Sequence, residues 1–133
     1  MRPRLGIEVA ASSDRAWHEL IDLGSWPHWG PTVRSAFLDD GSGRLSAGAS
    51  GSVQTALGLW LPFRVECWRD DGPLMSWSWR VAGVPATEHS VISRGPSRCR
   101  VDVSVPWWAV PYLGVVRVGL TRIRSRAEGV ASN

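Results

Sequence analysis

His89 is the side chain in this sequence whose position best suits it to chemistry. It falls in a run of alternating residues with Thr87 and Val91 on the same side, so we expect it to face the interior of a sheet. A buried histidine could hydrogen-bond a ligand carbonyl, or act as an acid or base near neutral pH. A histidine held by structural partners, or one that faces solvent, explains the same pattern equally well. His89 is therefore the candidate catalytic residue, although no motif around it specifies a reaction.

The remaining reactive residue types form no recognisable catalytic or metal-binding pattern. The three histidines, His18, His28 and His89, and the two cysteines lack HxxxH and CxxC spacing, so we expect no metal. The chain contains no lysine, which excludes Schiff-base catalysis. It also has no glycine-rich phosphate loop and no nucleophile elbow, so we expect no cofactor.

Two acidic residues could form an acid–base pair, Glu66 and Asp22, but nothing in their spacing places them together. Glu66 and Arg80 each lie between apolar neighbours in alternating runs. We therefore expect both to lie on the outer face of a sheet, away from any internal site.

Tryptophan is unusually frequent, with nine residues against two phenylalanines and one tyrosine. Any single tryptophan is adequately explained by ordinary core packing. Nine in a chain of 133 residues are more than packing usually requires. Small-molecule pockets are mainly apolar and aromatic with a few polar anchors, so the nine tryptophans together favour a pocket for a flat or hydrophobic molecule.

The first thirty residues predict a strand followed by two short helices. Residues 5–9 alternate between apolar and small or polar side chains, as in a half-buried strand. Ser12 or Ser13 can cap the next helix, and Gly24 is placed to end it. The buried face of this helix has residues at i, i+3 and i+4: Trp17, Leu20 and Ile21. Residues 26–33 predict a second short helical turn.

Residues 33–105 predict an antiparallel sheet. Four runs alternate between apolar and polar side chains, which is typical of strands with one buried and one solvent-facing side. Clusters of turn-forming residues at 39–43, 70–73 and 94–97 separate the runs. The inward-facing set includes Val53, Phe63, Val65, Cys67, Met75, Trp77, Trp79, Cys99, Val101 and Val103.

The pattern changes to a helical period after residue 110. Pro111 is well placed at the first helical position, and Tyr112, Val116 and Gly119 fall on the apolar face. At about 1.5 Å per residue this helix reaches about 25 Å, enough to cross a small sheet. A glycine on the buried face either lets the sheet approach closely or leaves room for a ligand.

Composition predicts one globular domain over residues 1–133. The net charge is +3 and the arginines are spread along the chain, so we expect no nucleic-acid binding. The longest uncharged stretch, residues 103–116, is too short and proline-broken to span a bilayer. Because Cys67 and Cys99 lie in alternating runs and no apolar leader is present, we expect buried free thiols in a cytoplasmic protein, as monomer or homodimer.

The order of these elements resembles the START-like (SRPBCC) superfamily, whose helix-grip fold is shared by polyketide cyclase/dehydrase-like proteins, the birch-pollen allergen and lipid-transfer domains. Residues 7–17, with Asp22, resemble the family's opening signature, and residues 26–31 resemble its Trp-Pro-x-Trp-x-Pro turn. Three further segments resemble its middle strands and closing helix: residues 74–80, 88–91 and 121–128. The resemblance implies an α+β fold in which a curved antiparallel sheet of six or seven strands wraps around a long C-terminal helix. No catalytic residue can be assigned from the resemblance, because branches of this superfamily place functional residues differently.

The resemblance also implies a cavity between the sheet and the final helix. The residues that we expect to contact a ligand there are Trp29, Phe63, Trp77, Trp79, His89, Trp108, Tyr112, Val116 and Gly119. Three functions remain open at this point. The first is binding of a hydrophobic or aromatic small molecule, polyketide- or lipid-like, and the second is a polyketide cyclase or aromatase reaction in the same cavity. The third is a module that meets membranes or a protein partner through Trp107, Trp108 and the arginine-bearing helix.

Overall fold

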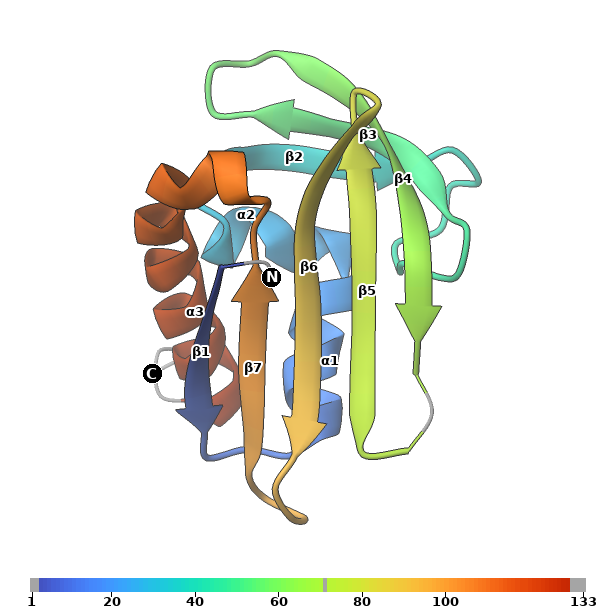
Figure 1. The fold of residues 1–133 in the computed structure, drawn as a ribbon. Helices are drawn as coiled ribbons and strands as arrows, with labels where there is room; N and C mark the ends of the chain where they lie inside the picture. The colour runs from blue at the N-terminus through green and yellow to red at the C-terminus, as the bar shows by residue number, and fades with distance from the viewer. Residues whose placement is uncertain (1–2, 71, 130–133) are drawn as a thin grey trace.

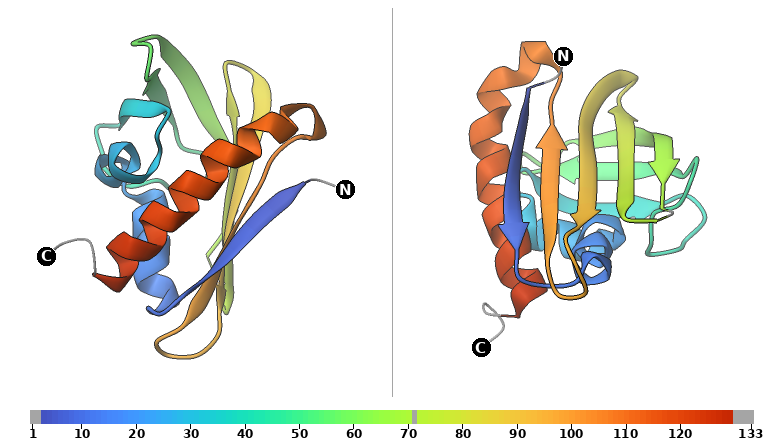
Figure 2. Two further views of the ribbon diagram at one scale, coloured as in Figure 1. Left: turned by 90° about the vertical axis from the view of Figure 1, so that its left-hand side faces the viewer. Right: turned by 60° about the horizontal axis from the view of Figure 1, so that its bottom comes forward.

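Seven antiparallel strands form one curved sheet, and the helices lie on one side of it (Figures 1 and 2). The computed structural model describes residues 3–70 and 72–129, except for the side chains of Trp107, Trp108 and Val110. The strands are β1 (Arg4–Val9), β2 (Val33–Leu38), β3 (Ser50–Thr55), β4 (Trp60–Arg69), β5 (Leu74–Val81), β6 (Val84–Ser93) and β7 (Cys99–Ser104). They are ordered β1-β7-β6-β5-β4-β3-β2, which confirms the expected antiparallel sheet.

Two α-helices, joined by a 3-10 turn, follow β1, as expected. These elements are α1 (Ser13–Ile21), η1 (Leu23–Ser25) and α2 (Trp26–Trp29). The Ser12 hydroxyl caps α1 by accepting a hydrogen bond from the backbone N–H of Arg15 at 3.3 Å. Gly24 does not end α1, because the helix stops at Ile21 and the Asp22 carboxylate then caps η1.

The C-terminal helix α3 (Leu113–Glu128) crosses the inner side of the sheet and packs against β1, α1 and α2 (Figure 2, left). It begins two residues later than expected, because Pro111 belongs to a preceding 3-10 turn, η2 (Trp107–Tyr112). Two polar contacts hold its end. Arg126 pairs with Glu19 of α1, and the Glu128 carboxylate accepts a hydrogen bond from the backbone N–H of Ala10 at 2.8 Å. None of the described helices is long and apolar enough to cross a membrane.

A β-bulge in β4 reverses which side chains face the core. The pairing of β4 with β5 shifts register between Val65 and Cys67. Trp68 consequently packs against Trp17, with ring centroids 5.3 Å apart, and Cys67 is exposed. The expectation of two buried thiols is therefore wrong for Cys67, because strict alternation does not hold across an inserted residue. Cys99 is buried, as expected.

Candidate functional site

An aromatic cluster fills much of the space between the sheet and α2. The indole of Trp26 lies parallel to that of Trp77, with centroids 5.7 Å apart, and also contacts Phe63 and Trp79. The Nε1 of Trp26 donates to the backbone carbonyl of Leu20 at 2.9 Å, and the Nε1 of Trp29 donates to that of Glu19 at 2.8 Å. The end of α1 therefore positions both tryptophans of the Trp-Pro-His-Trp turn.

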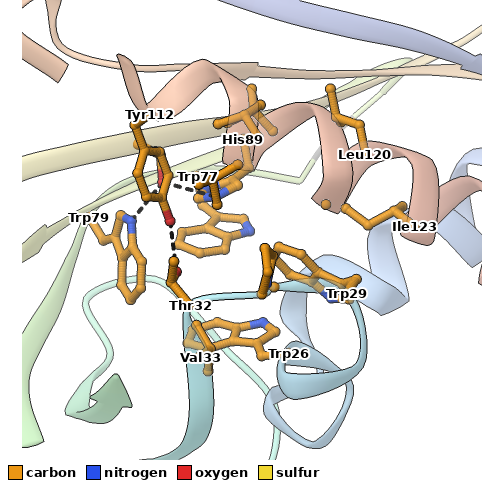
Figure 3. Close-up of a pocket in the computed structure, with 17 residues that line it drawn as sticks. Trp26, Trp29, Thr32, Val33, Trp77, Trp79, His89, Tyr112, Leu120 and Ile123 are labelled. Carbon is orange, nitrogen blue, oxygen red and sulfur yellow. Dashed lines mark hydrogen bonds between the residues drawn. The ribbon is translucent and has the colours of Figure 1, made fainter. Parts of the chain in front are cut away.

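His89 lies opposite Trp77 in the pairing of β5 with β6, and the two rings are stacked. The Thr87 hydroxyl accepts a hydrogen bond from Trp79 Nε1 at 3.0 Å and lies 3.1 Å from His89 Nε2 (Figure 3). Burial lowers the pKa of His89 from 6.5 to about 3, outweighing the opposite effect of the Trp77 backbone. His89 is therefore neutral at pH 7.

An inner cavity of about 60 Å³ lies beside Trp77 and His89, under α3 (Figure 3). This volume has room for a few water-sized groups and not for a whole ligand. Its lining comprises Trp26, Trp29, Gly30, Pro31, Thr32, Val33, Trp77, Trp79, Thr87, His89, Val103, Tyr112, Val115, Val116, Gly119, Leu120 and Ile123.

A larger outer cavity of about 330 Å³ adjoins the inner one. This volume falls in the range of small-molecule sites, roughly 300–1,000 Å³. Its lining comprises Thr32, Val33, Val53, Thr55, Leu61, Trp79, Val81, Ala86, Thr87, Val105, Pro106, Ala109 and Tyr112. Thr32, Val33, Trp79, Thr87 and Tyr112 line both cavities.

Few groups in the two linings can ionise. Among the described lining residues, His89 and Tyr112 are the ionisable ones, and the Tyr112 hydroxyl is hydrogen-bonded to Thr32 Oγ1 at 2.9 Å. Within the described parts of the chain, no group of three or more His, Cys, Asp or Glu residues is arranged to hold a metal ion. The chemistry of the site is thus that of an apolar enclosure with hydroxyl, indole and imidazole hydrogen-bonding groups.

Solved structures share this arrangement of sheet and helices. A hypothetical protein from Helicobacter pylori matches with a TM-score of 0.76 and 12% identity, over 93% of this chain and 86% of that one. A START superfamily protein from Mycobacterium smegmatis matches with a TM-score of 0.60 and 17% identity, over 96% of this chain and 97% of that one. The chain has the START-like helix-grip fold.

The same fold is found in a two-domain enzyme. The di-domain aromatase/cyclase BexL, from the BE-7585A biosynthetic pathway, matches with a TM-score of 0.67 and 12% identity, over 100% of this chain and 48% of that one. No family model matches the sequence, and a search of curated proteins finds no significant match. At identities this low, the structural likeness shows the fold and not the activity.

The START-like fold brings most of the expected ligand contacts to the inner cavity. Seven of them line it: Trp29, Trp77, Trp79, His89, Tyr112, Val116 and Gly119. Phe63 is buried against Trp26 and Trp79 and lines neither cavity. The Trp108 side chain lies outside the described residues. That these residues contact a ligand stays a prediction.

Sequence reasoning missed the small side chains that leave the outer cavity open. Val53, Ala86 and Ala109 come from β3, β6 and η2, and a search for aromatic side chains selects none of them. The alternating pattern of β3 did place Val53 on the inner side of the sheet. These positions form a cavity because their side chains are short. A search for aromatic residues therefore does not find them.

Gly119 marks a close approach of α3 to α2. A Cβ at this position would lie 3.3 Å from the backbone oxygen of Trp29. The two explanations expected for this glycine were a close approach of the sheet and room for a ligand. The backbone that approaches Gly119 belongs to α2 and not to the sheet, and Gly119 also lines the inner cavity, so the second explanation stays a prediction.

The acid–base pair considered from the sequence is not formed. Glu66 is paired with Arg80 at 2.6 Å, and both side chains are exposed, as expected for the outer face. The Asp22 carboxylate accepts hydrogen bonds from Gly24 N and Ser25 Oγ in η1. Both carboxylates thus have structural partners away from the cavities.

Proposed function

We propose that this protein binds an apolar, partly aromatic small molecule between the sheet and α3, with the body of the ligand in the outer cavity. The observation that carries the proposal is the outer cavity of about 330 Å³, whose lining is almost entirely aliphatic and aromatic. Burying about 200 Å² of apolar ligand surface contributes roughly 5 kcal/mol at 25 cal/mol per Å². A solved protein of the same fold is named an aromatase/cyclase, which agrees with a small-molecule site.

The properties of His89 favour binding over acid–base catalysis. An acid–base group works best when its pKa lies near the operating pH. The pKa of His89 is lowered to about 3 by burial, and its Nε2 is already engaged with Thr87. A cyclase-type reaction in this cavity would need another proton donor. We therefore infer that His89 orients groups in the site and transfers no proton at neutral pH.

The surface-module alternative depends on Trp107 and Trp108, whose side chains lie outside the described residues. No described contact favours it. Sedimentation with anionic liposomes at low and high salt tests it separately, because a surface-bound protein would co-sediment in a salt-dependent way.

Binding of 1-aminoanthracene, an uncharged aromatic probe, tests the proposed function. Ala86→Phe places a large ring in the outer cavity, and Val84→Phe adds the same ring at an exposed position of the same strand. We expect saturable binding of one probe per chain to the wild type and to V84F, and binding at least tenfold weaker in A86F. Equal binding by the two variants, with both folded by circular dichroism, would overturn the proposal.

A further inference from the structure

Two buried nitrogens in the lining of the inner cavity have no hydrogen-bond partner among the described residues, Nδ1 of His89 and Nε1 of Trp77. The imidazole nitrogen donates or accepts according to its tautomer, whereas the nitrogen of Trp77, a residue that is 1% exposed, is always a donor. An indole nitrogen carries a hydrogen and cannot accept a hydrogen bond. Any group that satisfies it must therefore be an acceptor.

The other indoles of the cluster are already paired. Trp26 and Trp29 donate to the backbone carbonyls at the end of α1, and Trp79 donates to the Thr87 hydroxyl. Burial alone therefore does not leave an indole unpaired in this cluster. All four of these tryptophans line the inner cavity, and Trp77 differs from the other three because its N–H has no protein acceptor in the described part of the chain.

The neighbourhood of this N–H suits an uncharged acceptor. In Figure 3, the nitrogen of Trp77 lies on the side of the ring toward Trp29 and α3. The described residues of the inner lining include no arginine, and His89, which stacks on Trp77, is neutral at pH 7 because burial lowers its pKa. A carboxylate would lose its hydration there without gaining a cation.

The sizes of the two cavities indicate which part of a ligand each one can hold. About 60 Å³ admits only the end of a molecule, whereas the outer cavity of about 330 Å³ admits its body. Thr32, Trp79 and Tyr112 line both cavities, so one molecule can extend from the outer into the inner one.

We propose that the ligand carries a neutral carbonyl oxygen, as in a ketone, quinone or ester, at the end that enters the inner cavity, and that Trp77 Nε1 donates the hydrogen bond that selects it. This inference rests on the proposed function, since it concerns the same site. It makes Trp77 a specificity-determining residue and requires no reaction.

Two bicyclic probes of nearly the same shape test this inference: 1-tetralone, which carries a ketone, and tetralin, which lacks it. Their dissociation constants are measured for the wild type, for Trp77→Phe and for Trp79→Phe. W77F keeps an aromatic ring beside His89 and removes the unpaired N–H. W79F is the matched control, because it removes an indole N–H that already has a protein partner.

The expected result is a change in selectivity. In W77F, the affinity for tetralone relative to that for tetralin falls about tenfold, which corresponds to about 1.4 kcal/mol. W79F changes the two affinities by similar factors. An unchanged ratio in W77F, with both probes bound, would overturn the inference and leave the proposed function intact. Failure of the wild type to bind either probe would overturn the proposed function, and the inference with it.

A second measurement on the wild type keeps the test valid if W77F does not fold. The indole signals in a ¹H–¹⁵N spectrum report each tryptophan N–H separately. Tetralone is expected to move the Trp77 signal downfield, and tetralin is not. If both probes bind and the Trp77 signal responds to neither or to both equally, the carbonyl does not reach this donor and the inference fails.

Discussion

The rings of Trp77 and His89 are stacked across β5 and β6, with centroids 4.1 Å apart and planes 25° from parallel. Both side chains are buried, at 1% and 4% exposure. Protonating His89 would place a positive charge in this apolar stack, which is why burial lowers its pKa to about 3. The stack therefore links the stability of the protein to pH.

Stability is expected to fall as the pH is lowered below 6.5. The pKa of His89 is about 3 in the folded protein and near 6.5 when unfolded, so the unfolded state takes up the proton first. Relative to pH 7.5, the free energy of unfolding is expected to be lower by about 2 kcal/mol at pH 5, and it levels off near pH 3. Urea unfolding at pH 7.5 and pH 5 measures it. His89→Gln should remove this part of the drop, whereas His28→Gln, at an exposed histidine, should retain it. An equal drop in both variants would contradict the assignment.

A larger side chain at Gly119 is expected to destabilise the protein. Because a Cβ there already lies 3.3 Å from the Trp29 backbone oxygen, Gly119→Leu must push α3 away from α2, at a cost of about 1–3 kcal/mol. Gly114→Leu in the same helix meets no atom within 4 Å and should be neutral or stabilising by up to about 1 kcal/mol. Thermal unfolding of the two variants compares them. Similar losses would show that the packing at Gly119 is not the cause.

Relief of backbone strain in the turn between β5 and β6 is expected to stabilise the protein. Ala82 has a φ of 53° and precedes Gly83, with a φ of 79°. Both values belong to the left-handed region, which asparagine tolerates better than alanine. Ala82→Asn should therefore raise the free energy of unfolding by roughly 1 kcal/mol. Ala56→Asn, at an exposed turn position without a positive φ, is the control and should give no gain.

The two thiols are expected to react at very different rates. Cys67 is exposed, whereas burial and the carboxylates of Glu8 and Glu128 raise the pKa of Cys99 to about 11. The thiolate is the reactive form, so a thiol reagent at pH 7.5 should label one cysteine per folded chain and two in urea. Mass spectrometry counts the labels. Rapid labelling of folded Cys67→Ser would show that Cys99 is accessible.

Local patterns were sufficient to predict the order of the elements. Alternating runs and turn clusters located most strands, and the helical spacing of Val116 and Gly119 located α3. The errors arose where one residue changes the geometry. The bulge after Val65 turned Cys67 outward, and η2 included Pro111, which had been expected to begin the helix. Cys67 is itself apolar, so the sequence still alternates across the bulge, and Pro111 suits the start of a 3-10 turn as well as that of an α-helix. Periodicity alone therefore reveals neither feature.

The candidate site was only partly predictable, for a different reason. Strand parity placed Trp77, Trp79 and His89 on the inner face, where the structure has them. The outer cavity depends on how the short side chains of β3, β4, β6 and η2 meet in space. Its location follows from strand register and sheet curvature, which a single sequence does not specify.

Methyl NMR of the wild type titrated with 1-aminoanthracene tests the central claim most directly. If the probe enters the outer cavity, shifts should concentrate at the methyl groups of Val53, Leu61 and Val105, which line it. The exposed side chains of Leu57 and Val84 should change little. Shifts confined to those exposed residues, or no shifts at a saturating probe concentration, would contradict binding between the sheet and α3.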